Sequence, residues 1–132
     1  MRSYRTARTV AHMEFTRELE KSDWKSFFDG LSQELPTSEI RIDIMSSELG
    51  DQVEAAGVVL HAMSYDPRSD EFEVVAMLGR PHTPALIHHR VDHPRHIWVD
   101  SRAGILPASI AVDAEDGTRT LLRIAQAPTL TS

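Results

Sequence analysis

The chain has 132 residues and a formal net charge of −6, and its 41% hydrophobic and 26% charged residues are typical of a globular domain. It contains no cysteine, which excludes disulfides, thiolate zinc sites, iron–sulfur clusters and cysteine nucleophiles. The acidic charge argues against non-specific binding to phosphate backbones, and no apolar run approaches the ~18–20 residues that cross a bilayer. Nucleic-acid and membrane partners are therefore not expected.

Three regions are predicted: a flexible arm at 1–13, a single globular domain at 14–126 and a frayed tail at 127–132. The arm is basic, with Arg2, Arg5 and Arg8, but it lacks the apolar stretch of a secretory signal. The expected location is therefore the cytoplasm. A domain of this length buries one core without disulfides or metals.

A helix is predicted over 22–35. Ser22 is a suitable N-cap, and Pro36 prevents the helix from continuing. The apolar residues of this segment fall on one helical stripe. They are Trp24, Phe27, Phe28, Leu31 and Leu35. Such a stripe predicts a face packed in the core rather than an exposed platform for a ligand.

The chain after Pro36 predicts β-structure throughout. Ile40, Ile42 and Ile44 alternate with other residues, as in a strand with one buried face. A bend is expected at Gly57, inside a long apolar strand. The predicted strands are 39–46, 53–65, 71–78, 85–91, 96–101, 105–114 and 118–125, with turns at 66–70 and 115–117.

One helix followed by six or seven short antiparallel strands predicts an α+β, mainly β, domain. The order of elements favours a small SH3-like or Sm-like barrel, or a bent sheet with the helix as its lid. A flatter sheet with the helix on one face is the alternative. The likeness to these barrels concerns layout and includes no binding motif.

Four segments of the chain resemble a bacterial family of small domains of unknown function. They are W-x-x-F-F-D-G-L-S at 24–32, E-L-G-D-Q-V-E at 48–54, L-H-A-M-S-Y-D-P at 60–67 and D-G-T-R-T-L-L-R-I at 116–124. The resemblance runs from Phe15 to Ile124 and consists mostly of helix, turn and strand positions. It implies one complete domain, and it brings no established activity and no catalytic residues.

The sequence shows none of the common catalytic or cofactor motifs. It has no glycine-rich phosphate loop, no glycine-flanked serine nucleophile and no H-E-x-x-H zinc motif. Asp113–Thr118 superficially suggests a calcium loop, but the residues that follow continue as a strand. We therefore assign no catalytic residue, no cofactor-binding residue and no cofactor, and the chain is not expected to be an enzyme.

Five of the seven histidines lie between Arg80 and Ser101. On an extended strand His88 and His89 point to opposite faces, so they cannot both face one ion. If 92–94 makes a turn, His89 and His96 approach each other across a hairpin, with His93 at its tip. Such a trio can bind zinc, copper or nickel, although Arg90 and Arg95 lie close by and disfavour a cation.

Metal binding by His89, His93 and His96 is therefore kept only as a minor alternative, and no metal site is predicted. A response to pH is a second alternative, because histidine titrates near neutrality. The favoured interpretation is a polar strand pair whose histidines are exposed or hydrogen-bonded. His61 lies in an apolar segment and is expected to be buried with a hydrogen-bond partner.

Segment 88–99 is predicted to form a β-hairpin near one edge of the sheet. Ile97 and Val99 are expected on the core side, and His93 at the exposed turn. Trp98 then lies on the outer face and needs cover from the helix, from the C-terminal hairpin or from a second subunit.

Three functions remain open. The favoured one is a non-enzymatic interaction module that self-associates into a homo-oligomer or docks a protein partner, because many short strands leave edges to cover. The second is a ligand- or metal-binding domain that uses the histidine segment with Arg90, Asp92 or Trp98. The third, a nucleic-acid binder, is suggested only by the Sm-like layout.

Overall fold

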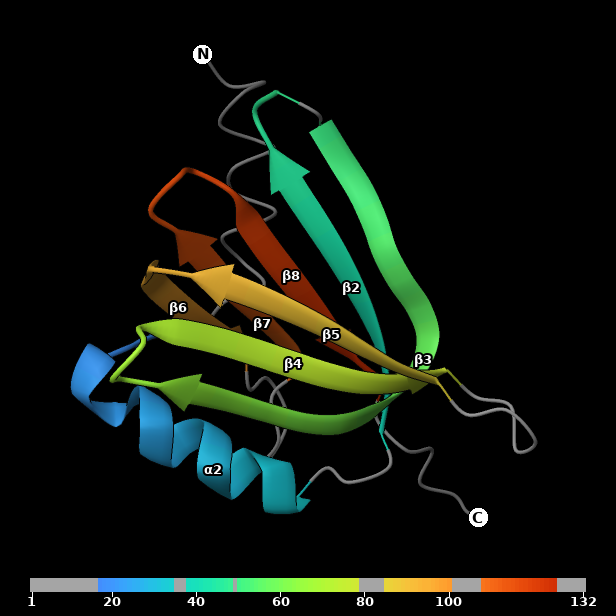
Figure 1. Cartoon of the computed structure of the whole chain (residues 1–132), viewed down its shortest axis with the longest axis horizontal. Helices are drawn as coiled ribbons and strands as arrows, with labels where there is room; N and C mark the ends of the chain where they lie inside the picture. Colours follow the sequence, from blue (N-terminus) through green and yellow to red (C-terminus); the bar gives the residue numbers. More distant parts are fainter. Residues whose placement is uncertain (1–16, 35–37, 49, 79–84, 101–107, 126–132) are drawn as a thin grey trace.

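The computed structural model describes residues 17–34, 38–48, 50–78, 85–100 and 108–125, so the predicted arm at 1–13 and tail at 127–132 lie outside it. Within these residues the chain forms one long helix, a short 3-10 helix and eight strands (Figure 1). The helical elements are η1 (Lys21–Asp23) and α2 (Trp24–Glu34). The strands are β1 (Arg17–Leu19), β2 (Glu39–Ser46), β3 (Gly50–Asp66), β4 (Glu71–Leu78), β5 (Ala85–Asp92), β6 (Pro94–Asp100), β7 (Ser109–Ala114) and β8 (Arg119–Ile124).

All eight strands belong to one antiparallel sheet with the order β1-β6-β7-β8-β2-β3-β4-β5. The mainly β fold with one helix is confirmed, but the predicted count of six or seven strands is wrong. The extra strand is β1, whose three residues are too few to show an alternating pattern. The sheet is not closed into a barrel, because its end strands β1 and β5 do not pair with each other.

β3 is the longest strand and serves two neighbours. Its first half pairs with β2 and its second half, from Val59, pairs with β4. The bend predicted at Gly57 is present: this glycine has φ +67 and is skipped in the register with β2, as in a β-bulge. The left-handed backbone there favours a residue without a Cβ. This bend lets the sheet fold over, so that β5 contacts β7.

The helix begins at Trp24, two residues later than predicted, because 3-10 helix η1 occupies Lys21–Asp23 and Ser22 is not the N-cap. The predicted core stripe is confirmed for Trp24, Phe28 and Leu31, which are buried, whereas Phe27 is only partly buried. Leu35 lies outside the described residues. The indole Nε1 of Trp24 donates a hydrogen bond to the backbone oxygen of Leu19, at 3.2 Å.

The helix α2 packs along the second half of β3, below β4 in Figure 1. The hydroxyl of Ser32 donates to the backbone oxygen of Met63 at 2.8 Å and accepts from the backbone N–H of the same residue at 3.1 Å. These two bonds satisfy backbone groups on a strand edge that β2 does not reach. The helix therefore covers one edge that the sheet leaves open.

The core lies between the folded halves of the sheet, and α2 packs against it. Phe28 and Phe72 meet with ring centroids 5.0 Å apart, and Trp24 packs edge-on against Tyr65 at the same distance. As predicted, Ile97 and Val99 face the core, and both are fully buried. Ile40 and Ile42 are also buried, whereas Ile44 is only half-buried.

Candidate functional site

The histidine segment does not form the predicted hairpin. β5 pairs with β4, whereas β6 pairs with β1 and β7, so the two consecutive strands lie near opposite ends of the strand order. They are joined at His93, which has φ 54. This left-handed residue directly before Pro94 turns the chain away from the direction of β5. The next strand, β6, then pairs with β1 and β7.

His88 and His89 point to opposite faces, as predicted. His88 lies on the outer face, where its Nδ1 is 2.9 Å from Oε2 of Glu73 on β4. His89 points inward, and its Nε2 is 3.1 Å from the hydroxyl oxygen of Thr120 on β8. The predicted approach of His89 to His96 is therefore wrong, because each histidine has a partner on a different strand.

A cleft of about 180 Å³ opens beside His89, between β5 and the β7–β8 hairpin. Burial lowers the pKa of His89, and the negative charge of Glu54 opposes this only in part, so the imidazole is neutral at neutral pH. The guanidinium of Arg90 is directed to the other face, where its Nε lies 3.6 Å from Glu73. The cleft is lined by His89, Arg90, Val91, Asp92, Ala114, Asp116, Thr118 and Thr120.

The cleft thus unites some of the residues that the sequence suggested for a ligand site, but not Trp98. That residue lies on β6, where its Nε1 donates to Oδ2 of Asp113 at 3.1 Å. The indole of Trp98 thus has a hydrogen-bond partner on the C-terminal hairpin. The cleft can offer hydrogen bonds from a neutral imidazole and from hydroxyls. The hydroxyl of Thr120 lies beside the His89 imidazole, as a nucleophile lies beside its base, but Thr120 is only 2% exposed.

His93 belongs to a second cluster, at the turn between β3 and β4. Its Nδ1 is 3.2 Å from Oδ2 of Asp70, whose Oδ1 accepts a 2.6 Å hydrogen bond from the hydroxyl of Tyr65. Lys21 lies 3.6 Å from the same Oδ1. Asp70 also has a left-handed backbone, with φ 55. The backbone N–H of His93 donates to the backbone oxygen of Asp70, which ties the β5–β6 junction to this turn.

Hydrogen bonds, charges and burial in this cluster shift the pKa values of Asp70, His93 and Tyr65. The Tyr65 hydrogen bond, followed by those from His93 and the Lys21 charge, lowers the pKa of Asp70. The bond to Asp70 raises the pKa of His93, helped by the charges of Asp70, Glu115 and Asp92. Burial and then Asp70 raise the pKa of Tyr65, so its hydroxyl remains a donor at physiological pH.

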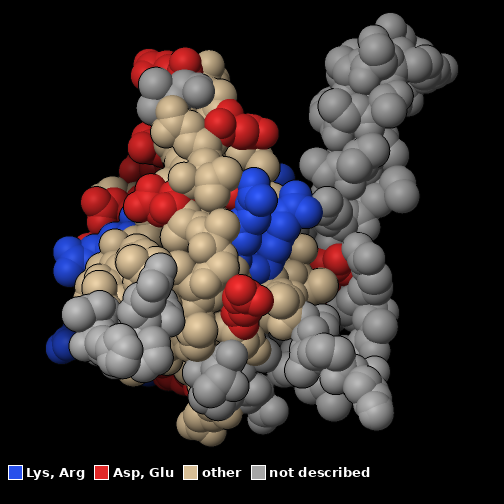
Figure 2. Space-filling view, turned by 90° about the vertical axis from the view of Figure 1, so that its right-hand side faces the viewer, with Lys and Arg blue, Asp and Glu red and all other residues tan. Residues whose placement is uncertain are grey.

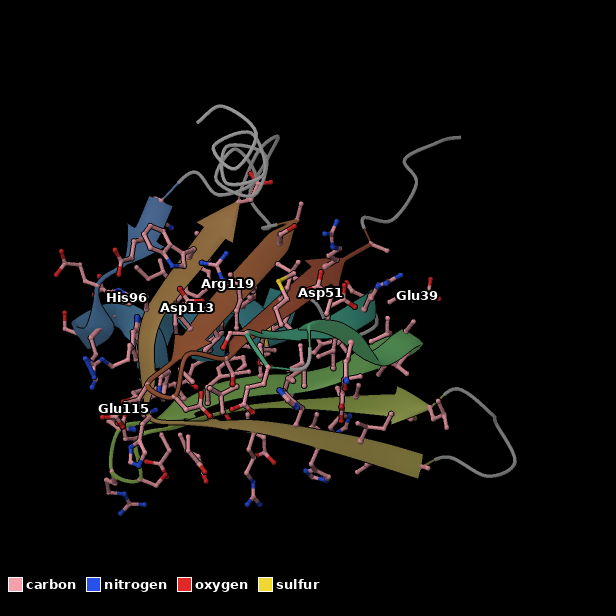
Figure 3. The ribbon with its side chains drawn as sticks, turned by 90° about the horizontal axis from the view of Figure 1, so that it is seen from above. Glu39, Asp51, His96, Asp113, Glu115 and Arg119 are labelled. Carbon is pink, nitrogen blue, oxygen red and sulfur yellow. The ribbon has the colours of Figure 1, made fainter. Side chains whose placement is uncertain are left out.

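His96 begins a polar row on the outer face of β6, β7 and β8 (Figure 3). Its Nδ1 is 2.6 Å from Oε2 of Glu18 on β1, and its ring stacks on Trp98 with centroids 6.2 Å apart. Arg119 donates two hydrogen bonds to Asp113, at 2.6 and 3.0 Å. This row was not predicted from the sequence, although Asp113 and Arg119 flank the predicted turn at 115–117 and could be expected to pair across it.

The predicted burial of His61 is also wrong. It is exposed, not buried, because β3 has a register shift between Leu60 and Ala62 that leaves this residue out of the pairing with β4. An extra residue in a bulge is left unpaired, so the apolar residues around His61 in the sequence do not bury it.

Metal addition is expected to leave the melting temperature of the chelator-treated protein unchanged. His89, His93 and His96 each contact a different strand or turn, and the described part of the chain holds no group of three His, Asp or Glu residues arranged around an ion. A site that binds the folded state raises the melting temperature by mass action. The measurement is thermal unfolding with and without zinc or nickel, and a rise of several degrees with either metal contradicts the prediction.

The outer face of β3, β4 and β5 carries an apolar patch that the sequence analysis did not identify. The patch lies in two neighbouring rows of the register. Val59, Met77 and Leu86 form one row across all three strands, and Ala62 and Val75 lie in the next row, on β3 and β4. We call these five residues the outer patch. Leu86 is 51% exposed and the other four are half-buried. The strand positions between them, such as Leu60 and Ala76, face the core and are buried.

None of the helices in the described ranges combines the length and the apolar character needed to span a bilayer. No solved structure matches the chain. An uncharacterized protein of Aquifex aeolicus (strain VF5) is 37% identical over 109 residues, which cover 83% of this chain and 91% of that protein. The model of a family of unknown function, DUF5335, matches residues 15–131. This span agrees with the resemblance noted at Phe15 to Ile124, and the chain belongs to the DUF5335 family.

Proposed function

We propose that the protein is a non-enzymatic interaction module that forms a homodimer through the outer patch. The supporting observation is the patch itself: five apolar side chains adjoin one another on three paired strands and face away from the core. Contiguous apolar surface of this kind commonly marks a protein interface. Residues 14–126 are proposed as the interacting unit.

A second copy is the proposed partner because the rim of the patch is self-complementary. On the same outer face, β4 presents Glu73 and β5 presents His88 and Arg90. Glu73 contacts His88 and Arg90 within the chain, and a two-fold axis between β4 and β5 lets these side chains contact their counterparts in the other copy as well. Both signs of charge on neighbouring strands therefore favour an interface between identical surfaces.

The likeness to SH3-like and Sm-like barrels remains part of the proposal. It is supported by the order of one helix and then bent antiparallel strands, although the sheet here is open. Binding domains of this layout act through their surfaces and not through a catalytic centre. The burial of Thr120, whose hydroxyl lies beside His89 in the cleft, is consistent with such a role.

Replacing Leu86 with aspartate is expected to convert the dimer to a monomer. The charge is placed at the most exposed position of the outer patch, where dimerisation removes it from water. We expect self-association to weaken at least about thirtyfold, which corresponds to about 2 kcal/mol. Size-exclusion chromatography with light scattering measures this at high micromolar concentration.

The matched control is Val53→Asp, since Val53 is 54% exposed on β3 but lies outside the patch. This variant should remain dimeric. A wild-type chain that is monomeric at high micromolar concentration overturns the proposed function, as does a dimer that Leu86→Asp leaves intact.

A further inference from the structure

The first half of β3 has an edge that no described strand covers. β2 pairs with one side of this segment, but β4 begins to pair with the other side only at Val59. Figure 1 shows the β2–β3 hairpin projecting upward, away from β4 and β5. The second half of β3 differs, because the Ser32 hydroxyl on α2 satisfies the backbone of Met63 there. Segment 50–57 therefore offers backbone donors and acceptors to a further strand.

Acidic side chains accompany this edge along its length. Asp51 and Glu54 lie on the strand itself and are exposed. On the paired side of β3, Glu39 of β2 extends towards Gly57, and its Oε2 lies 3.6 Å from the position of a Cβ added to that glycine. Figure 3 labels Glu39 and Asp51, and Figure 2 shows acidic side chains at the top of the molecule, where the hairpin projects.

The projecting end of the hairpin carries few basic side chains, and the basic cluster in Figure 2 lies lower on the same face. The sequence from 42 to 67 contains no lysine and no arginine. Arg41 is the basic residue on the neighbouring strand, and its Nε donates to Oδ1 of Asp43 at 2.9 Å. Val53, 54% exposed between the carboxylates, adds an apolar contact. The edge thus combines unpaired backbone, negative charge and one exposed apolar side chain.

We propose that segment 50–57 binds an extended, basic segment of a partner protein by strand addition. Main-chain hydrogen bonds to the β3 edge supply affinity, and arginine or lysine side chains opposite Asp51 and Glu54 supply specificity. A second copy of the same edge does not fit, because antiparallel self-pairing sets carboxylates against carboxylates. This site is separate from the outer patch and does not depend on it.

The test uses the full chain and a labelled peptide of sequence TRVTRVTR, which places arginine and valine on both faces of an added strand. Fluorescence anisotropy at 0.15 M salt should show saturable binding. Asp51→Lys with Glu54→Lys should weaken it about tenfold or more, whereas Glu115→Lys with Asp116→Lys, an equal change of charge at the exposed β7–β8 turn, should not. Amide hydrogen exchange should slow within 50–57 when the peptide is bound.

Two further peptides separate strand addition from simple charge attraction. A peptide with N-methyl groups on alternate residues should bind at least tenfold more weakly, because it cannot complete the ladder. A peptide with glutamate for arginine should not bind. Equal binding by the N-methylated peptide, unchanged binding to the Asp51/Glu54 variant, or no binding at all overturns the proposal.

The chain's own basic N-terminal residues are a competing occupant. If the peptide binds only after Arg2, Arg5 and Arg8 are replaced by serine, the edge is assigned to this segment of the chain and the proposal of a separate partner fails. Binding of similar strength before and after this replacement supports the separate partner.

Discussion

Phe72→Ala is expected to lower the free energy of unfolding by about 3–5 kcal/mol. Phe72 is fully buried on β4, and its ring lies 5.0 Å from that of Phe28, at the contact between α2 and the sheet. Removing the ring leaves a cavity that the surrounding strands cannot fill, because the backbone of a paired central strand moves little. Equilibrium unfolding in urea measures the change.

Phe27→Ala provides the control. Phe27 is only partly buried and touches Phe28 edge-on, with centroids 5.1 Å apart, so its loss removes less contact and admits water. We expect it to have less than half the effect of Phe72→Ala, with the same dependence on urea concentration. If the two variants are equally stable, Phe72 does not have the central place in the core that the structure gives it.

The local elements of the fold were predictable where the residue pattern is long and regular. Strands 39–46 and 71–78 were predicted with the bounds found for β2 and β4, because each alternates between a buried and a less buried face. The bend at Gly57 followed from a glycine inside an apolar strand. The inward positions of Ile97 and Val99 followed from their spacing alone.

The pairing of strands was not predictable in the same way. Segment 88–99 has the alternation of two strands and a proline between them, which fits a hairpin as well as it fits a crossing between halves of a sheet. The left-handed backbone of His93 and its bond to Asp70 decide between the two, and both are tertiary features. The expected approach of His89 to His96 depended on this hairpin, because it required β5 and β6 to be neighbours.

The two proposed interaction surfaces were also beyond the sequence pattern. The outer patch consists of residues that look like core when only their composition is considered, and the register alone shows that they face outward. The free edge of β3 depends on where β4 stops pairing. Edge and face are properties of the assembled sheet, so single-strand periodicity does not reveal them.

Asp70→Ala is expected to lower the free energy of unfolding by about 2–5 kcal/mol. The change leaves the hydroxyl of Tyr65, a residue that is 4% exposed, without its acceptor, which costs about 1–3 kcal/mol. It also places alanine at φ 55, where the left-handed backbone costs about 1–2 kcal/mol. Asp70→Asn is the matched control, because asparagine tolerates this backbone and keeps an acceptor for Tyr65.

At neutral pH the Asn variant should lose less than half as much stability as the Ala variant. The dependence of stability on pH should separate the contribution of the Asp70 charge from that of the turn geometry. The folded state lowers the pKa of Asp70, so its carboxylate stabilises the fold above the ordinary aspartate pKa of about 3.9, and this contribution disappears as the pH falls through the folded value. The difference between wild type and Asp70→Asn should therefore shrink below about pH 4.

The contribution of His93 to stability depends on pH in the opposite direction. The folded state raises its pKa, so the protonated ring stabilises the fold below the ordinary histidine pKa of about 6.5, and this contribution is lost as the pH rises through the folded value. Wild type should consequently gain its largest advantage over Asp70→Asn between about pH 4 and 6.5, where Asp70 is ionised and His93 is protonated. Urea unfolding from pH 3 to 9 tests this, and an advantage that does not vary across that range shows that the cluster acts through shape and not through charge.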